Sequence, residues 1–327
     1  MNHPLGITLV IPSYNRAKLI IETIESALNQ SVPFTEIIVV DDASTDSTLI
    51  ELKKFGRKIT VVASEKIGVQ AARNKGVALA STEYVTLCDS DDLLDFNFVA
   101  MIGDWLIQRS DCDSIYSNFI TFDESSTSTD KFSLAPSSFF KDAVKSGSFL
   151  HKIPDLYVKT VEFQPLFSSG VTIRKQFYQS IGGYDPTLNG VGSEDWEYTL
   201  RAIENGETAV CLIPLVKIRR HLGNDSNNKI RQLLGEVTVL ELALTSHKSA
   251  GQFKDEIDLG INSRRCQAFE LAFGLHQFDI ANSILCQIFR KPNSIKFHIK
   301  IILTRLIFRL HSYSRASKLQ KSVSISN

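Results

Sequence analysis

Residues 7–45 read "ITLVIPSYNRAKLIIETIESALNQSVPFTEIIVVDDAST", and this stretch decides the fold. Two apolar, β-branched runs at 7–13 and 36–42 enclose a segment whose apolar residues recur at helical spacing. Continuous apolar strands separated by amphipathic helices are typical of a parallel sheet that is covered on both faces. The stretch therefore predicts a strand, a helix and a second strand parallel to the first.

The same alternation continues to about residue 92 and predicts an α/β fold with a mostly parallel sheet and helices on both faces. We expect a first domain at 1–228, made of two halves at 1–120 and 121–228. From 229 to 327 the apolar residues recur mainly at helical spacing, as in "IRQLLGEVTVLELALTSH". The sequence therefore predicts a helical C-terminal region after the α/β domain.

The composition is that of a globular protein, with 36 Lys+Arg balanced by 36 Asp+Glu. A net charge of zero does not indicate a nucleic-acid partner. The five cysteines are scattered without a C-x-x-C pair, so neither a disulfide framework nor a zinc site is predicted. The first residues lack the pattern of a secretory signal, and no apolar run is long enough to span a membrane, so we expect a cytoplasmic protein.

Polar residues gather where the predicted strands end, as "PSYN" after the first, "DDAST" after the second and "DSDD" after the fourth. In open α/β sheets, ligands bind outside the carboxyl ends of the strands. The carboxylates of Asp89, Asp91 and Asp92 are close enough in sequence to repel one another, and a Mg²⁺ or Mn²⁺ ion carrying substrate phosphates would relieve that repulsion. The alternative is a solvated acidic loop that caps a helix beginning near Leu93.

These motifs, taken in order, resemble those of family 2 glycosyltransferases of the GT-A fold. The family's pattern is matched here over about 7–224 by five segments: Pro12-Ser13-Tyr14-Asn15, Asp41 to Asp46, Ala72 to Gly76, Asp89 to Asp92, and Glu194-Asp195. Each segment alone is a weak signal, because an Asp pair at a strand end is more often a turn and a helix cap. The resemblance rests on the whole set.

The resemblance implies a nucleotide-binding half at 1–120 and an acceptor-binding half at 121–228. It implies that Pro12 and Tyr14 wall a nucleobase pocket, that Asp42 accepts a hydrogen bond from the base, and that Arg73 meets the base or the diphosphate. The implied donor-binding residues are Pro12, Tyr14, Asn15, Asp42, Arg73, Asp89 and Asp91. The implied ligands of a divalent metal, Mn²⁺ or Mg²⁺, are Asp91, Asp89 and His221.

The acidic pair Glu194-Asp195 is the implied catalytic motif, with Asp195 as general base and Glu194 in support or in contact with the acceptor. The alternative is that both residues cap the helix that they begin. For His221, which follows Arg219 and Arg220, a structural role is the alternative to contact with metal or phosphate. The expected enzyme is thus an inverting, metal-dependent hexosyl- or N-acetylhexosaminyl-transferase of polysaccharide biosynthesis.

The expected substrates are a nucleotide-sugar donor and a glycan or lipid-linked acceptor. A UDP-sugar suits Asp42, although thymine presents the same edge, so a dTDP-sugar stays open. A nucleotidyltransferase is one alternative, but its glycine-rich phosphate loop after the first strand is replaced here by "PSYN". A catalytically inactive protein that binds sugar nucleotides or glycans is the other.

The C-terminal tail is basic and apolar, since 229–327 carries 15 Lys+Arg against 7 Asp+Glu and no acidic residue follows Asp279. A basic amphipathic helix can lie in the headgroup region of an anionic membrane, which would make the protein peripheral on the inner face of the plasma membrane. The alternative is a helix packed on the catalytic domain with a basic outer face.

Overall fold

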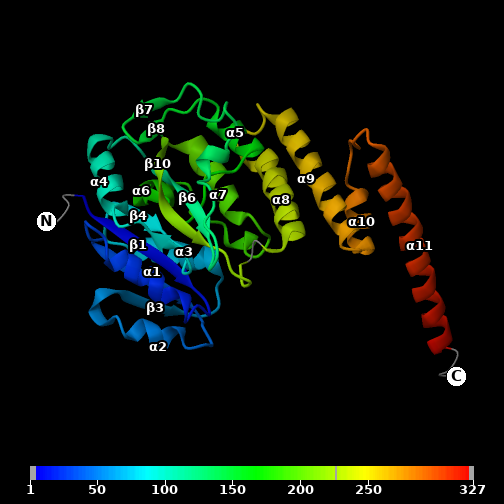
Figure 1. The fold of residues 1–327 in the computed structure, drawn as a ribbon, viewed down its shortest axis with the longest axis horizontal. Coiled ribbons are helices and arrows are strands. Elements are labelled where there is room, and N and C mark those ends of the chain that lie inside the picture. The colour runs from blue at the N-terminus through cyan, green and yellow to red at the C-terminus, as the bar shows by residue number, and fades with distance from the viewer. Residues whose placement is uncertain (1–4, 225–226, 324–327) are drawn as a thin grey trace.

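The strand, helix and strand predicted from 7–45 form as β1 (Ile7–Ser13), α1 (Leu19–Leu28) and β2 (Glu36–Asp42), with β1 and β2 parallel. The structure, a computed structural model, describes residues 5–224 and 227–323. In both strands the apolar run is followed by polar side chains, Ser13 in β1 and Asp41 and Asp42 in β2, and each strand ends with these residues, as predicted. The α/β fold that was predicted from residues 7–45 is therefore confirmed (Figure 1).

In the part of the chain that the structure describes, the sheet has ten strands in the order β3-β2-β1-β4-β9-β6-β10-β8-β7, with β5 paired to β10. Its first four strands are parallel, and the short β9 is antiparallel to both β4 and β6. The other strands are β3 (Thr60–Ser64), β4 (Tyr84–Leu87), β5 (Leu93–Leu94), β6 (Ser114–Phe122), β7 (Val144–Ser146), β8 (Phe149–His151), β9 (Thr172–Arg174) and β10 (Thr208–Arg219).

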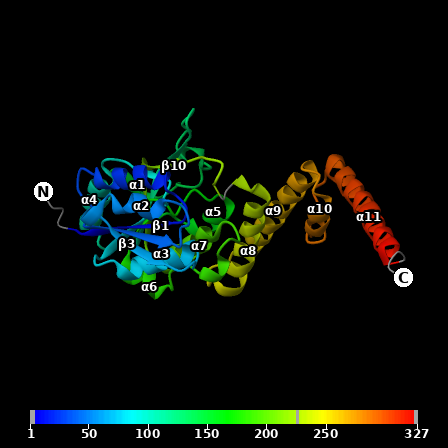
Figure 2. The same ribbon diagram turned by 90° about the horizontal axis from the view of Figure 1, so that it is seen from below.

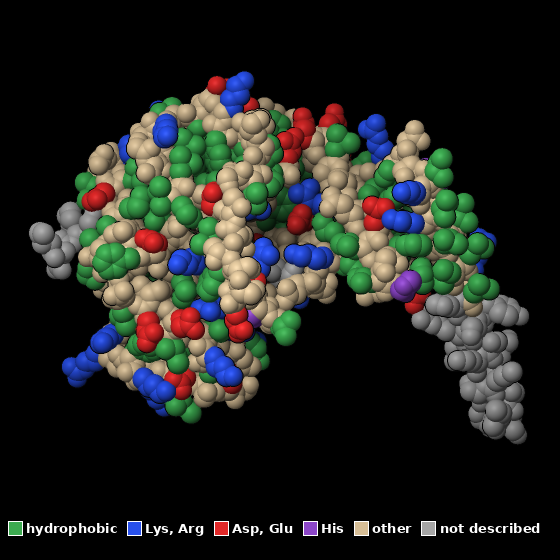
Figure 3. Space-filling model, in the orientation of Figure 1, with side chains coloured by type: hydrophobic (Ala, Val, Ile, Leu, Met, Phe, Trp, Pro, Cys, Tyr) green, Lys and Arg blue, Asp and Glu red, His purple; other side chains and the backbone are tan. Residues whose placement is uncertain are grey.

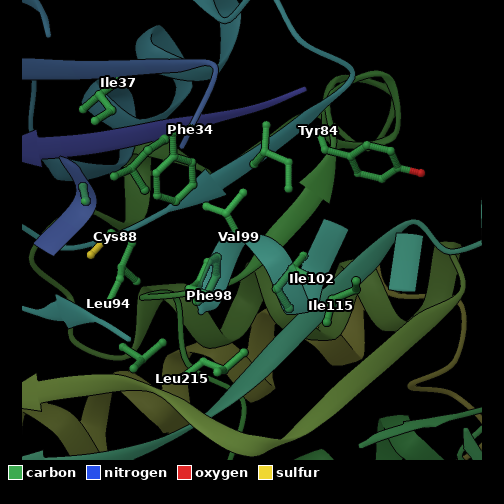
Figure 4. Packing of buried hydrophobic residues seen from close by; sticks show 14 of the residues in the cluster. Phe34, Ile37, Tyr84, Cys88, Leu94, Phe98, Val99, Ile102, Ile115 and Leu215 are labelled. Atoms are coloured by element: carbon green, nitrogen blue, oxygen red, sulfur yellow. The ribbon is translucent and has the colours of Figure 1, made fainter. Parts of the chain in front are cut away.

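Helices cover both faces of this sheet, as expected for strands that are apolar on both sides. Along β1, Leu9 and Ile11 point into one buried cluster and Val10 into the other. The first cluster is covered by α1, α2 (Thr48–Lys53) and α4 (Phe98–Gln108), and Figure 4 shows part of it around Phe34, Phe98 and Ile102. The second is covered by α3 (Val69–Leu79), α6 (Lys175–Ser180) and α7 (Glu194–Asn205).

Gly76 allows α3 to lie close against the sheet. A Cβ at this position would stand 2.3 Å from Cγ1 of Val10 on β1, well inside van der Waals contact. This close approach explains the glycine of the "ARNKG" segment in physical terms. It also fixes the position of Arg73, one helical turn earlier on α3.

The segment that directly follows the acidic cluster Asp89–Asp92 is not helical. The alternative interpretation, in which this cluster caps a helix, required a helix that begins near Leu93. Leu93–Leu94 form β5, which pairs with Lys217 and Val216 of β10, and the next helix, α4, begins only at Phe98. A helix cap near Leu93 is therefore wrong as an explanation of the acidic cluster. The cause is a strand pairing with a segment more than a hundred residues away, which local periodicity does not reveal.

After residue 228 the described elements are helices: α8 (Lys229–Ser246), α9 (Lys254–Gly274), α10 (Phe278–Leu285) and α11 (Ile295–Val323). Figure 2 shows them leading away from the sheet as an arm. The base of the arm is joined to the α/β part, because α8 and α9 share a buried cluster with α7 and α5 (Leu156–Glu162). Within the described ranges, no helix combines the length and the apolarity needed to cross a bilayer.

Among the described residues, the remaining elements are short 3-10 turns at Gly56–Lys58, Phe132–Leu134 and Pro186–Leu188. The last of them lies in the glycine-containing approach to α7 and begins with Asp185, whose carboxylate accepts the Thr187 N–H at 2.8 Å. This approach ends at Ser193 with a positive φ of 60° immediately before α7. The loop before α7 therefore has a defined conformation, and it positions Glu194 and Asp195, the first two residues of the helix.

Candidate functional site

The carboxyl ends of β1, β2 and β4 meet at one edge of the sheet, and the predicted polar segments follow them there. Ser13 of β1 pairs in register with Asp41 of β2, and the Cys88 N–H after β4 donates to the Val10 carbonyl at 3.1 Å. The loops at 14–18, 43–47 and 88–92 therefore leave from neighbouring strands. This is the edge at which open α/β sheets bind ligands.

Asp42 is buried and its carboxylate is held by the backbone that leads into α3. Oδ1 accepts the N–H groups of Ile67 and Gly68 at 2.6 and 3.1 Å, and Oδ2 lies 2.9 Å from Nζ of Lys66. The Lys66 ammonium also lies over the ring of Tyr14, 2.8 Å from its centroid. Lys66 therefore sits between the two side chains that were expected to hold a nucleobase.

Asn15 ties the first two loops together. Its side-chain Oδ1 accepts the N–H of Thr45 at 2.8 Å, and its own N–H donates to Oγ of Ser44 at 2.9 Å. Asn15 and Ala43 both have positive φ, 51° and 62°, a conformation that costs energy for a residue with a side chain. Residues in such strained conformations are often found at ligand sites. Here they define the conformation of the loops at 14–18 and 43–47.

Pro12 lies buried within β1, whereas Tyr14 is 41% exposed at its end. Of the two residues, Tyr14 has the solvent-exposed side chain at the edge of the sheet. Pro12 belongs to the strand that precedes the loop at 14–18.

Arg73 is buried and its guanidinium donates to the Asp89 carboxylate, with 2.6 Å between Nη2 and Oδ1. Burial works against the charge, but the Asp89 carboxylate holds the pKa of Arg73 above its ordinary value. Gln70 accepts a second bond from the guanidinium at 3.0 Å. The arginine of "ARNKG" and the first acid of "DSDD" therefore form one ion pair.

Two serines complete this ion pair and were not predicted. Ser168 Oγ lies 3.4 Å from Arg73 Nη2, and Ser169 Oγ accepts the Asp89 N–H at 3.1 Å. They belong to "FSSG", which lies between α5 and β9 and has no pattern that distinguishes it from an ordinary loop. Arg16, which directly follows "PSYN", was likewise not assigned a role.

Asp91 is held by two cationic or donor groups. Its Oδ2 lies 3.0 Å from Nε2 of His221 and 3.4 Å from Nε of Arg16. Nδ1 of His221 accepts the Gly223 N–H at 3.1 Å, which assigns the proton to Nε2 in the neutral ring. His221 therefore donates to Asp91 here, and binding a cation through Nε2 would require the other tautomer, in which Nδ1 carries the proton and no longer accepts the Gly223 N–H.

Asp92 is fully buried beside Asp91 and Asp89. Burial, followed by the repulsion of these two carboxylates, raises the pKa of Asp92 well above its ordinary value, although the Arg219 N–H donates to its Oδ1 at 2.9 Å. The raised pKa means that Asp92 favours its neutral form beside the two other carboxyl groups. A divalent cation bound at this cluster would favour the charged form instead.

The donor set fits a cation held jointly by protein and substrate rather than a complete protein cage. Over residues 5–224 and 227–323, no three His, Cys, Asp or Glu side chains are grouped as a metal site. Asp91 and His221 are together, while Asp89 is paired with Arg73. Mg²⁺ is commonly bound by one or two protein groups together with substrate phosphates, and Asp91 suits that arrangement.

Asp195 lies at the start of α7 and is only partly exposed. Burial raises its pKa to about 6; Arg73 opposes this shift, and Glu194 and Asp89 add to it. The Asp195 carboxylate is therefore coupled to the Arg73–Asp89 pair, although these residues are distant in sequence. A carboxylate with a pKa near neutrality suits a general base.

Glu194 has a supporting contact in the structure. Its Oε1 accepts the Gly190 N–H at 3.0 Å and so closes the loop that leads into α7. The Arg73–Asp89 ion pair and the Asp91–His221 contact lie at this edge of the sheet, and Arg73 and Asp89 both affect the pKa of Asp195. Asp42 is joined to them through Gly68, the residue from which α3 begins.

Comparison with known proteins identifies a related family. Residues 8–156 match the model described as "Glycosyl transferase family 2". The chain is 35% identical over 145 residues to a putative teichuronic acid biosynthesis glycosyltransferase, TuaG, of Bacillus subtilis, and covers 57% of its length. It is 35% identical over 123 residues to the glycosyltransferase GlyG of Streptococcus pneumoniae, and covers 40% of its length. These stretches are 43% and 36% of this chain, which spans about half the length of the two relatives.

Solved structures share the fold. S. aureus TarS 1–349, crystallised with UDP-GlcNAc, aligns with a TM-score of 0.59 at 17% identity, over 87% of this chain and 82% of the other. The alignment includes most of the chain, so it confirms the mostly parallel sheet with its added C-terminal helices. The same TarS segment with UDP aligns with a TM-score of 0.52.

Proposed function

Given that this chain belongs to glycosyl transferase family 2, whose model its residues 8–156 match, we propose that it transfers one sugar, with inversion, from a UDP-sugar to a hydroxyl of a glycan or lipid-linked acceptor. The observations that support the proposal are the effect of Arg73 and Asp89 on the pKa of Asp195, and the stacking of Tyr198 of α7 on Tyr184, whose ring centroid lies 5.1 Å from the Arg73 guanidinium. They indicate that the candidate base lies near the edge that follows β1, β2 and β4. Donor and base would then meet at this edge.

The nucleoside is bound between Tyr14 and Asp42. The exposed Tyr14 ring offers a stacking face, and Oδ2 of Asp42 accepts the imide N–H of uracil. The Asp42 carboxylate keeps its backbone bonds to Ile67 and Gly68, which hold it in place. Lys66 leaves its position over Tyr14 when the base enters. The complex of TarS with UDP-GlcNAc supports a UDP-sugar donor by analogy of fold.

Replacing Lys66 by Met is expected to strengthen UDP binding by up to about fivefold, because the ion pair between the exposed Lys66 and the buried Asp42, worth about 1 kcal/mol, no longer has to be broken. The dissociation constant is measured by calorimetric titration with UDP. Lys75→Met is the matched control, since Lys75 donates only to the Ala63 carbonyl on the neighbouring strand. Weaker binding by the Lys66 variant would mean that Lys66 binds the nucleotide and does not merely occupy its site.

A divalent ion, held by Asp91 with His221 as second candidate ligand, would supply positive charge for the departing diphosphate. Side chains of the protein supply further positive charge. Arg73 stays charged because Asp89 raises its pKa, so it can act on the diphosphate at every physiological pH. Arg16, 3.4 Å from Asp91, adds a second positive group on the same side.

The chemical step is a single displacement. The acceptor oxygen forms a bond to the anomeric carbon while the bond from that carbon to the diphosphate oxygen breaks, and Asp195 takes the hydroxyl proton. UDP leaves with the electron pair of the broken bond. One displacement without a covalent intermediate inverts the configuration at the anomeric carbon.

The pH dependence of the reaction tests the role of Asp195. The base acts as a carboxylate, and its pKa is about 6, so kcat/KM should fall about tenfold per pH unit below pH 6 and level off above it. The rate is followed as UDP released from the UDP-sugar that the protein turns over. A profile that stays flat down to pH 4.5 would show that no group with this pKa is the base.

A further inference from the structure

The exposed side of α11 is apolar. Between residues 295 and 310 its exposed large hydrophobic side chains are 41 to 81% accessible: Ile295, Ile299, Ile302, Leu303, Leu306 and Leu310. Their spacing of three and four residues places them on one face of the helix, which we call the α11 stripe. Figure 3 shows hydrophobic side chains gathered at the end of the molecule where Figure 1 places α11.

The stripe does not serve the core of the protein. The opposite face of α11 does that, since Phe297 and Ile301 are buried in the cluster that also holds Phe269 of α9. The ring of Phe297 packs 5.1 Å from that of Phe269. The alternative of a helix packed on the catalytic domain with a basic outer face is therefore wrong, because α11 packs on α9 and α10 and its outward face is apolar.

Basic side chains flank the stripe on both sides. On a helix of 3.6 residues per turn, Lys296 and Lys300 lie along one border and Arg305 and Arg309 along the other. Lys296, Arg305 and Arg309 are exposed, and Lys300 is bound to Glu270 of α9 at 2.6 Å. An apolar face bordered by long basic side chains can sink among acyl chains while the charged ends reach the headgroups.

The basic charges beside the α11 stripe also distinguish its two possible partners, a second copy of the stripe and an anionic lipid surface. Pairing of two α11 stripes would bring Lys and Arg borders together, and residues 295–323 include no Asp or Glu to compensate. Like charges facing each other across a helix pair are destabilising. An anionic lipid surface compensates all of these charges at once, with about 1 kcal/mol for each basic residue near it. No helix in the described residues is suited to span a bilayer, so α11 would lie in its surface.

We infer that the α11 stripe is a docking surface for an anionic lipid bilayer. This surface is separate from the donor site and does not depend on the identity of the sugar. It holds the chain on the bilayer by a helix that lies flat, with its apolar face inward. The full chain should therefore sediment with phosphatidylcholine vesicles that contain phosphatidylglycerol, and not with vesicles of phosphatidylcholine alone.

The test uses point variants, because removing α11 would also strip Phe297 from its buried cluster. Ile299→Ser with Leu306→Ser is expected to lower the partition coefficient onto the anionic vesicles by at least about 10-fold. Arg305→Glu with Arg309→Glu should lower it by roughly fivefold per residue or more. The matched control is Ile50→Ser with Leu79→Ser, two side chains that are 62 and 51% exposed on α2 and α3. It should bind as the wild type does.

UDP titration and thermal unfolding check that each variant is folded, and they keep this test independent of the proposed reaction. Equal loss of vesicle binding in the stripe variant and in the control would overturn the inference. So would a wild-type chain that stays in the supernatant with anionic vesicles. A wild-type dimer in sedimentation velocity that the stripe variant splits into monomers would assign the stripe to a second copy instead.

Discussion

Asp195→Asn is expected to lower the rate of UDP release from a UDP-sugar by at least about 10²-fold while UDP binding is retained. The amide has the size of the carboxylate but cannot take a proton from the acceptor. Arg73 keeps Asp89 as its partner, so the donor side of the site is left intact. The initial rate at saturating donor and the calorimetric dissociation constant for UDP measure the two effects separately.

Glu194→Gln is the matched control for this variant. It removes the neighbouring carboxylate but leaves an amide oxygen that can accept the Gly190 N–H, as Glu194 does now. Its rate should stay within an order of magnitude of the wild-type rate. If Asp195→Asn retained the full rate, or if both variants lost activity equally, the base would have to be sought elsewhere.

Asp91→Ala is expected to abolish the part of UDP binding that depends on Mn²⁺, which should weaken binding in Mn²⁺ by at least about 10-fold. The carboxylate that offers a ligand to the ion is lost, while Tyr14 and Asp42 still bind the base. Titration with UDP in Mn²⁺ and in EDTA measures the difference. The two conditions should give the same dissociation constant for the variant.

Glu22→Ala is the control for Asp91→Ala. Glu22 is an exposed acid that pairs with Arg219 at 2.7 Å, so its loss removes the same charge near the site but no proposed ligand. Its UDP binding should respond to Mn²⁺ as that of the wild type does. An Asp91 variant that still binds UDP more tightly with Mn²⁺ than with EDTA would remove Asp91 from the metal site.

The sequence was most informative where local pattern and topology agree. The apolar runs give way to polar residues at Ser13 and Asp41, so the strand ends, and with them the positions of Tyr14 and Asp42, could be placed from the sequence alone. The parallel arrangement then requires the polar segments to share an edge. The gathering of these segments at one edge was predictable for this reason.

Long-range pairing was not predictable in the same way. Leu93–Leu94 pair with β10, and Arg73 and Asp89 affect the pKa of Asp195, through a chain path that no local period encodes. Ser168 and Ser169 bind the ion pair from a loop without a motif. The position of Lys66 over Tyr14 likewise follows from the fold of the loop before α3 and not from its sequence pattern.

The helical arm shows a similar limit. Helical spacing predicted the change to helices after residue 228, and the basic tail suggested a membrane or a packed helix as alternatives. Only the structure separates the residues of α11 that enter the core, such as Phe297, from those that stay exposed, such as Leu306. Both kinds are apolar and recur at helical spacing, so composition alone could not assign them.

The decisive experiment is turnover of a panel of UDP-, dTDP- and GDP-sugars by the full chain, with Mn²⁺ and with EDTA, in the presence of glycan acceptors or water. At least one UDP-sugar should be converted to free UDP, and EDTA should suppress this release. A folded protein that binds UDP but releases nucleoside diphosphate from none of these donors would contradict the proposed reaction.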